Sequence, residues 1–194
     1  MSQNRLLIAA VLSAFCAIGI AGEELTDSRD GKRYRTVEIG SQTWMAENLN
    51  YEADGSKCYE NNSANCEKYG RLYNWETAKK ACPSGWHLPS RSEYEALDKA
   101  VGGEGEAGKK LKAKSGWNNN GNGTDDFGFS ALPGGDSYSD SGFYGIGNSG
   151  SWWSSSDGKS IYAYNRYIYY NFSDVTKYSG TKSYLLSVRC IRNN

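Results

Sequence analysis

Short segments of alternating or aromatic residues dominate the pattern of the chain and predict β-strands. Residues 34–39 alternate in character, and Gly40-Ser41 turns the chain towards a second run at 43–45, which predicts a β-hairpin. Strands are also expected where hydrophobic or aromatic residues gather between stretches rich in Gly, Asn and Ser. These further segments are 69–75, 127–135, 150–156, 162–170 and 184–191.

The middle of the chain has the pattern and the end signals of α-helices. Residues 74–82 begin at Asn74, a helix-capping residue, and Pro83 follows directly. The clearest helix covers 90–101, where a capping box begins the helix, apolar residues recur on one face and two glycines end it. A shorter helix is expected within 106–117. The pattern predicts one α+β domain, in which two to three helices pack on short antiparallel strands joined by long Gly/Asn/Ser-rich loops.

Residues 1–21 have the layout of a secretory signal peptide. Arg5 precedes an apolar run, and small residues at positions 19 and 21 suit cleavage after Ala21. Residues 22–194 would then form a single secreted domain. The sequence has no second apolar stretch, so we expect no membrane span after cleavage. Loss of Arg5 leaves 21 basic and 22 acidic residues, and this balance argues against a nucleic-acid partner.

Four cysteines remain after the expected cleavage, and an even number in an exported chain predicts disulfides. Three pairings of Cys58, Cys66, Cys82 and Cys190 are open on the sequence alone. We prefer Cys58–Cys66, which closes a short polar loop, and Cys82–Cys190, which joins the middle of the chain to its end. Zinc fits less well, because the spacing contains no CxxC pair and the chain has one His.

Residues 74–97, NWETAKKACPSGWHLPSRSEYEAL, resemble the start of the C-type lectin-like domain. In that family a cysteine at the end of the first helix pairs with a cysteine in the last strand, which implies the pairing of Cys82 with Cys190. The segment 87–97 is also similar to the formylglycine-generating sulfatase-modifying domain. That activity needs a free cysteine pair near the C-terminal region, which this chain lacks.

A second resemblance covers residues 30–194, where motifs in a fixed order resemble the Fibrobacter succinogenes major paralogous domain. Members of that family are exported bacterial proteins with no assigned biochemical function. The resemblance therefore implies a fold and a location, either secreted, in the periplasm or on the outer surface of a bacterium, and it supplies no catalytic residue. The motifs lie at 30–51, 69–75, 82–90, 123–135, 152–156 and 187–193.

The Asn-rich segment after Trp117 is a candidate calcium site, because its side-chain oxygens are hard ligands of the kind calcium prefers. Calcium is the one cofactor that the sequence suggests. The segment does not fit the EF-hand pattern and lacks the Glu-Pro-Asn, Gln-Pro-Asp and Trp-Asn-Asp signatures of sugar-binding C-type lectins. The candidate ligands are Asn118, Asn120, Asn122, Asp125 and Asp126.

Aromatic residues of two predicted strands form a candidate binding surface, because exposed rings stack on sugars and on proteins. Trp152 and Trp153 lie on opposite faces of a strand, and the tyrosines of 162–170 occupy both faces. One set of rings should therefore be exposed unless a loop covers it. The candidate ligand-binding residues are Trp153, Tyr164, Tyr167 and Tyr169.

Catalysis has less support in the sequence. His87 is the only histidine, and its place between two predicted helices favours a structural role. Asp125 and Asp126 would point to opposite faces of a strand, although Asp136 or Asp140 could complete a glycosidase pair. We expect an exported, non-catalytic binding module for carbohydrate or a protein partner. A structural cell-surface or adhesin protein is the alternative, and a hydrolase comes third.

Overall fold

The computed structural model describes residues 20–193 except 22 and 139–141. The expected signal peptide lies outside these residues, apart from Ile20–Ala21, whose backbone forms the edge strand β1 and pairs with β4. The first sheet has the order β1-β4-β5-β14-β7, and all of its strand pairs are antiparallel. Its other strands are β4 (Thr36–Ile39), β5 (Gln42–Met45), β14 (Ile191–Arg192) and β7 (Trp86–His87).

The second sheet has the order β12-β11-β10-β13-β6 and is antiparallel except for the pair β10–β13. Its strands are β12 (Thr176–Thr181), β11 (Tyr162–Tyr169), β10 (Ser149–Asp157), β13 (Leu186–Ser187) and β6 (Leu72–Tyr73). Two small hairpins complete the strands: β2 (Leu25–Thr26) with β3 (Arg33–Tyr34), and β8 (Asp136–Ser137) with β9 (Phe143–Tyr144).

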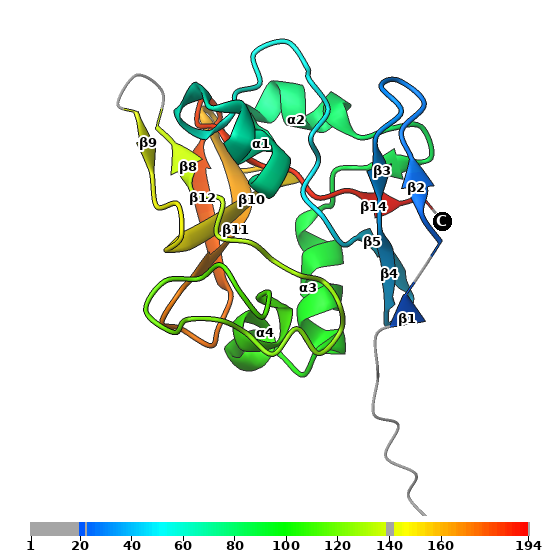
Figure 1. Cartoon of the computed structure of the whole chain (residues 1–194), viewed down its shortest axis with the longest axis vertical. Coiled ribbons are helices and arrows are strands. Elements are labelled where there is room, and N and C mark those ends of the chain that lie inside the picture. The colour runs from blue at the N-terminus through cyan, green and yellow to red at the C-terminus, as the bar shows by residue number, and fades with distance from the viewer. Residues whose placement is uncertain (1–19, 22, 139–141, 194) are drawn as a thin grey trace, which may run out of the picture.

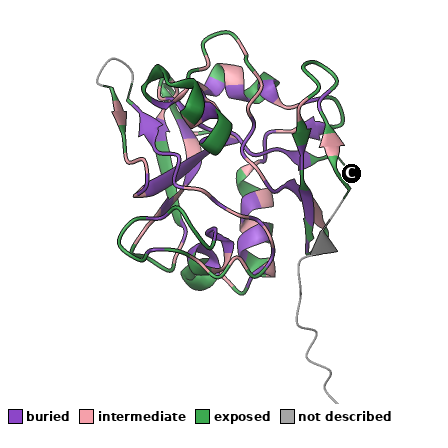
Figure 2. Ribbon diagram, in the orientation of Figure 1, coloured by how far each residue is buried: buried purple, intermediate pink, exposed green. Residues whose placement is uncertain are grey.

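Helix α3 lies between the two sheets, and the other helices flank the second sheet (Figure 1). Apolar residues of both sheets and of α3 form one core cluster, which includes Trp44, Leu97 and Trp152. The buried side of α3 is visible in Figure 2. The helical segments are the 3-10 turn η1 (Tyr59–Asn61), α1 (Ser63–Tyr69), α2 (Trp75–Ala81), α3 (Arg91–Ala100) and α4 (Glu104–Leu111).

Local sequence signals account for several of these elements. The predicted hairpin is β4–β5, and Gly40 takes the positive φ of 63° that the turn requires. Asn74 caps α2 by accepting a hydrogen bond from the Thr77 backbone. The capping box of α3 is also present, with both of its reciprocal hydrogen bonds. The α+β class, the hairpin and these two helices are therefore confirmed.

Other local predictions were wrong. Helix α1 lies where the sequence suggested only a loop closed by a disulfide, and β12 was not predicted. Residues 127–135 do not form a strand and contribute only two isolated bridges, from Ala131 to Lys112 and from Gly135 to Gly150. The predicted strand at 184–191 divides into β13 and β14, which belong to different sheets. Tertiary contacts decide the secondary structure of these segments, because a short segment has only a weak preference for helix or strand by itself.

Disulfides occur at the two preferred pairings. Cys58 bonds to Cys66, which connects the approach to η1 with α1. Cys82 directly follows α2 and bonds to Cys190, which is fully buried beside β14. The second bond spans 108 positions of sequence, so it constrains the unfolded chain more than the first in the chain-entropy model.

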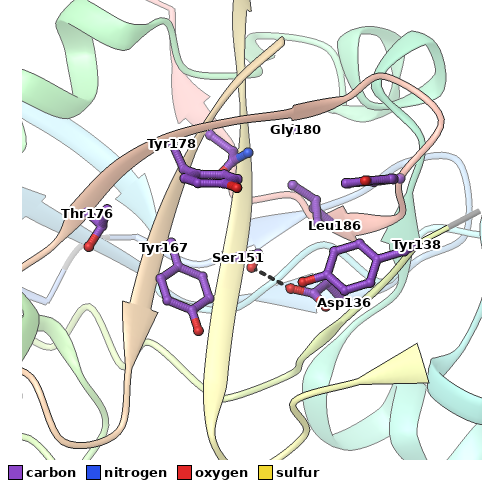
Figure 3. Close-up of a pocket in the computed structure, with 10 residues that line it drawn as sticks. Asp136, Tyr138, Ser151, Tyr167, Thr176, Tyr178, Gly180 and Leu186 are labelled. Carbon is purple, nitrogen blue, oxygen red and sulfur yellow. Dashed lines mark hydrogen bonds between the residues drawn. The ribbon is translucent and has the colours of Figure 1, made fainter. Parts of the chain in front are cut away.

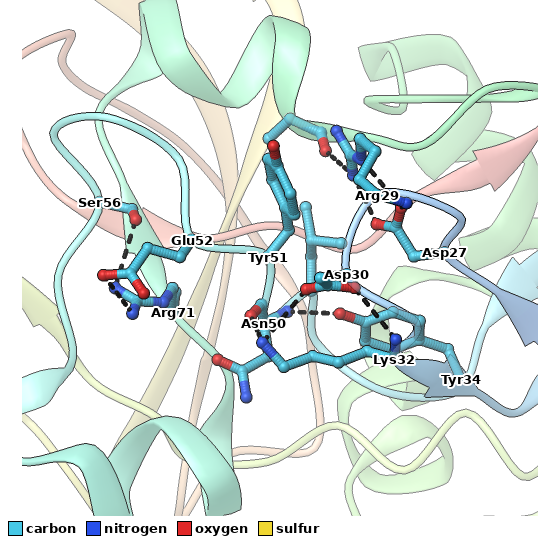
Figure 4. Close-up of polar contacts among 12 residues, drawn as sticks. Asp27, Arg29, Asp30, Lys32, Tyr34, Asn50, Tyr51, Glu52, Ser56 and Arg71 are labelled. Carbon is cyan, nitrogen blue, oxygen red and sulfur yellow. Dashed lines mark hydrogen bonds and ion pairs between the residues drawn. The ribbon is translucent and has the colours of Figure 1, made fainter.

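Polar contacts attach the N-terminal hairpin β2–β3 to the rest of the domain (Figure 4). The fully buried carboxylate of Asp27 accepts hydrogen bonds from the backbone and guanidinium of Arg29. The same guanidinium donates to the Ala81 carbonyl at the end of α2 and lies 3.7 Å from the ring centroid of Tyr51. Lys32 donates to the Asn50 carbonyl. These bonds position the loop that contains Asn50 and Tyr51.

A buried Arg189–Asn48 pair connects the two sheets. The guanidinium of Arg189 is fully buried and donates to Asn48 Oδ1 from two nitrogens, at 3.2 and 2.9 Å. It also donates to the carbonyl oxygens of Phe129 and Ser130 in the long loop. Asn48 Oδ1 further accepts from Trp152 Nε1 of β10. One amide oxygen thus accepts hydrogen bonds from Arg189 in the C-terminal segment and from Trp152 in the second sheet.

Removal of this amide should destabilise the protein strongly. In Asn48→Ala a buried guanidinium loses its side-chain acceptor, so we expect the free energy of unfolding to fall by about 3–5 kcal/mol. Urea denaturation under oxidising conditions measures the change. The exposed Asn171→Ala is the control and should change the value by less than about 0.5 kcal/mol. If Asn48→Ala lowered the unfolding free energy no more than Asn171→Ala does, this result would contradict a stabilising role for the pair.

A second buried pair, Asp98 of α3 and Arg166 of β11, predicts a pH effect. Their charged atoms approach to 3.1 Å, but Asp98 Oδ2 forms no hydrogen bond within the described chain. Burial raises the pKa of Asp98 to about 6, despite the attraction of Arg166. The folded state thus holds a proton that the unfolded state releases between about pH 4 and 6, so the stability from this group is lost as the pH rises.

We therefore expect the difference in unfolding free energy, Asp98→Asn minus wild type, to increase from about pH 4 to about pH 7. Urea denaturation of both proteins across this range measures it. Glu93→Gln is a matched comparison, because the pKa of Glu93 is lowered where that of Asp98 is raised. Burial acts to raise the pKa of Glu93, but hydrogen bonds from Ser90 and His87 lower it. The unfolding free energy of Glu93→Gln minus that of the wild type should increase only as the pH falls below about 4.5. A flat Asp98→Asn difference would contradict the raised pKa.

Candidate ligand-binding site

One face of the second sheet carries a pocket. Residues directly opposite one another in antiparallel strands share a face, and Ser151 of β10 lies opposite Tyr167 of β11. On the same face, Asn165 of β11 lies opposite Tyr178 of β12. Helix α3 packs against the other face, through Tyr94 and the Asp98–Arg166 pair. The sheet therefore uses one face for the core and leaves part of the other open.

The pocket is a cavity of about 450 Å³, within the range of small-molecule binding sites. Figure 3 shows Tyr167 and Tyr178 on one side of the hydrogen bond between Ser151 and Asp136, and Tyr138 on the other side. The lining contains aromatic rings together with a few polar groups. It consists of Asp136, Tyr138, Ser151, Asn165, Tyr167, Thr176, Tyr178, Gly180, Tyr184 and Leu186.

Polar side chains form the deepest part of the pocket. Asp136 is only 4% exposed, and its carboxylate accepts a hydrogen bond of 2.9 Å from Ser151 Oγ. Burial raises the pKa of Asp136, and hydrogen bonds from Ser151 and Tyr138 offset part of this rise. The amide of Asn165 is also buried and lines the cavity. These groups can orient a polar ligand that enters the pocket.

Tyrosine rings form the sides of the pocket. Tyr138 stacks on Tyr144 at 5.3 Å between ring centroids and meets Tyr184 edge-on at 4.8 Å. On the other side, Tyr178 is 61% exposed, while Tyr167 stacks on Tyr169 at 6.1 Å between ring centroids. Burial raises the pKa of Tyr138 to about 12, so its hydroxyl stays protonated at neutral pH. Such rings offer apolar faces and hydroxyl groups together.

Two glycines allow the backbone to take this shape. Gly135, just before β8, has φ of 67°, and a Cβ at this position would lie 2.4 Å from the Tyr144 carbonyl oxygen. The β8–β9 hairpin, which carries Asp136, depends on this close approach. At Gly180 of β12, a Cβ would lie 3.2 Å from the amide nitrogen of Asn165 and 3.3 Å from the Tyr184 ring. A larger residue at Gly180 would narrow the pocket.

The four predicted ligand-binding aromatics do not form one surface. Trp153 is fully buried, and its indole nitrogen donates to the Tyr73 carbonyl, so its assignment to an exposed surface was wrong. Tyr164 lies on the opposite face of β11 from Tyr167, with the Arg91 guanidinium 4.8 Å from its ring centroid. Tyr167 lines the pocket and Tyr169 stacks on it.

The other pocket residues were not predicted from the sequence to bind a ligand. Asp136 was considered only as a possible carboxylate of a glycosidase, and Tyr138, Tyr178 and Tyr184 were not considered. A sequence signal existed for β12, where Tyr178 and Gly180 alternate with exposed polar residues. Nothing in the sequence brings Tyr138 next to Tyr184, because this contact follows from the bridge between Ser137 and Leu185.

The candidate calcium ligands occupy the loop after Trp117, and several form internal hydrogen bonds. Asn118 donates to Asn148 Oδ1, and Asn122 Oδ1 accepts from the Trp117 backbone. Both carboxylate oxygens of Asp125 accept hydrogen bonds from Ser130, at 2.7 Å each. The side chains of Asn120 and Asp126 are exposed. Within the described part of the chain, no three His, Cys, Asp or Glu residues gather in a group that could hold a metal.

His87 lies in the joint between α2 and α3 and connects α3 with the C-terminal segment. Its Nδ1 lies 2.6 Å from Asn193 Oδ1, and its Nε2 lies 2.7 Å from Glu93 Oε1. Its strand, β7, pairs with β14 through Ile191. Both ring nitrogens therefore have structural partners, as the sequence analysis expected for this residue.

Together these features define an α+β domain with two disulfides among its described residues and a tyrosine-lined pocket on one sheet. The family model of the Fibrobacter succinogenes major domain matches residues 37–192, and the chain belongs to this family. No curated protein and no solved structure matches this chain. No helix in the described residues has the length and apolar character needed to cross a membrane.

The internal hydrogen bonds of the Asn-rich loop predict a weak response to calcium. Calcium would have to displace Ser130 from Asp125 and the Trp117 backbone from Asn122. We therefore expect about 5 mM calcium to raise the melting temperature by less than about 1 °C relative to chelator. Differential scanning fluorimetry measures this. A rise of several degrees that Asp125→Asn abolishes would contradict the expectation and identify the loop as a calcium site.

Proposed function

We propose that this chain is an exported, non-catalytic module that binds carbohydrate in the tyrosine-lined pocket of the second sheet. The observation that carries the proposal is the set of rings from Tyr138, Tyr167, Tyr178 and Tyr184 around buried polar groups in a cavity of about 450 Å³. Sugars present apolar faces and a rim of hydroxyl groups, so they fit rings beside hydrogen-bonding side chains.

The ring geometry supports a ligand that stacks. Tyr178 presents more than half of its surface to solvent, and Tyr138 is 38% exposed across the cavity. Between them, Asn165 and Asp136 can form hydrogen bonds with hydroxyl groups. A sugar ring could therefore contact tyrosine on its apolar face while its hydroxyl groups meet the amide and the carboxylate.

Disulfides support both export and a lectin-like architecture. Disulfides persist in oxidising compartments, which favours a location in the periplasm, on the cell surface or outside the cell. Cys82–Cys190 joins the end of α2 to the C-terminal strand segment, which is the connection expected of a C-type lectin-like domain. In this proposal, however, the sugar site is the face of the second sheet rather than a calcium loop.

Substitution of pocket tyrosines tests the proposal. We expect a glycan and plant-polysaccharide array to identify a ligand of the oxidised domain, and Tyr178→Ala or Tyr167→Ala to weaken binding by about tenfold or more. Isothermal titration calorimetry with the identified glycan measures the loss. Tyr164→Ala is the matched control, since it removes the same ring from the opposite face of the same strand.

The outcomes separate the pocket from the remaining surface. Equal losses for Tyr164→Ala and Tyr167→Ala would place the ligand elsewhere and contradict the pocket. An array without any bound glycan would contradict carbohydrate as the ligand class and favour a protein partner. Near-ultraviolet circular dichroism of each variant verifies that its fold is retained.

A further inference from the structure

Asp136 is a buried carboxylate without a basic partner. Among the described residues no Lys or Arg forms an ion pair with it, and its hydrogen bonds come from the neutral hydroxyls of Ser151 and Tyr138. Asp27 and Asp98, the other buried aspartates among the described residues, each lie beside an arginine. Asp136 differs from both because it lines a cavity that a ligand can enter.

A buried carboxylate without a cation is costly, because hydroxyl hydrogen bonds replace only part of its lost hydration. The pKa of Asp136 is raised because burial makes its charged form costly. A ligand with a positive charge would supply the missing partner. The surrounding tyrosines favour the same charge, because the face of an aromatic ring attracts a cation and repels an anion.

We infer that the ligand carries a protonated amine that binds next to Asp136, which for a carbohydrate means a sugar unit with a free, unacetylated amine. This inference rests on the proposed function, since it assigns a chemical class to the sugar in the same pocket. The amine donates to the carboxylate, and the Tyr167 and Tyr178 rings contact the sugar. The tyrosines provide affinity, and Asp136 provides selectivity for the charged unit.

A metal ion explains the pocket less well than an amine. Calcium takes six to eight oxygen ligands, often from several carboxylates. Among the described residues that line the cavity, Asp136 is the only carboxylate, and the remaining groups are hydroxyls, one amide, a glycine and a leucine. One carboxylate surrounded by aromatic rings matches an organic ammonium group instead.

Two oligosaccharides that differ only at the amine test the inference. We would titrate the oxidised chain at about pH 6 with the β-1,4-linked tetramer of glucosamine and with its fully N-acetylated form. The wild-type protein should bind the free-amine tetramer at least about tenfold more tightly. Asp136→Asn keeps the shape of the side chain and removes its charge, so it should reduce this preference to less than about twofold.

Two further variants control for charge and for folding. Asp126→Asn removes one negative charge from an exposed position outside the pocket, so it should leave the preference unchanged. Ser151→Ala keeps the charge of Asp136 but removes one of its two hydroxyl partners, and should retain the preference for the amine. If Asp136→Asn does not fold, equal binding of the two tetramers by the wild type and by Ser151→Ala still overturns the amine.

The outcomes distinguish this inference from the proposed function. Equal binding of both tetramers, or tighter binding of the acetylated form, would overturn the amine and leave the carbohydrate pocket standing. Equal loss of preference in Asp126→Asn and Asp136→Asn would also overturn it, because general charge attraction would then suffice. Binding of neutral glycans alone would reject the amine class. Binding of neither tetramer and of no glycan on the array would overturn both proposals.

Discussion

The buried Arg189–Asn48 pair is the interaction on which the arrangement of the two sheets depends. The C-terminal segment contributes β13 to one sheet and, after Arg189 and Cys190, β14 to the other. A chain that passes between two sheets must satisfy its polar groups where neither sheet provides a full ladder. The backbone N–H groups of Leu49 and Met45 do this for the Val188 and Cys190 carbonyls. The Arg189 guanidinium meanwhile joins Asn48 to the carbonyls of the long loop. Cys82–Cys190 then fixes α2 to the same segment.

This arrangement leads to the pocket. With α3 and the first sheet on one face of the second sheet, residues such as Trp152 and Ile168 are committed to the core. Helix α2 and its neighbours bury Trp153 and Ala163 at one end of the other face. The remainder of that face carries Ser151, Asn165 and Tyr167, and the β8–β9 hairpin encloses it beside Asp136. The pocket is thus the part of the sheet that no helix covers.

Of the predicted ligand-binding aromatics, Tyr167 lines the pocket, whereas Trp153 is buried in the core. Alternation places Trp152 and Trp153 on opposite faces, yet both side chains are buried, because each face of the sheet is covered at that position. Ser151 lies two residues before Trp153 on the same face of β10, opposite Tyr167 and outside the cover of α2. Strand parity determines the face of a residue, but the position of the covering helix determines its exposure.

The sequence by itself determined the α+β class, the β4–β5 hairpin, the capped ends of α2 and α3, and the cysteine spacing that suits both disulfides. These depend on contacts within a few residues or on chemistry that one residue type carries. Only the tertiary structure decided that Asp136, Tyr138, Tyr178 and Tyr184 converge and that the 184–191 segment divides between two sheets. Such contacts join distant parts of the chain, and their energies arise from burial and pairing that no local pattern contains.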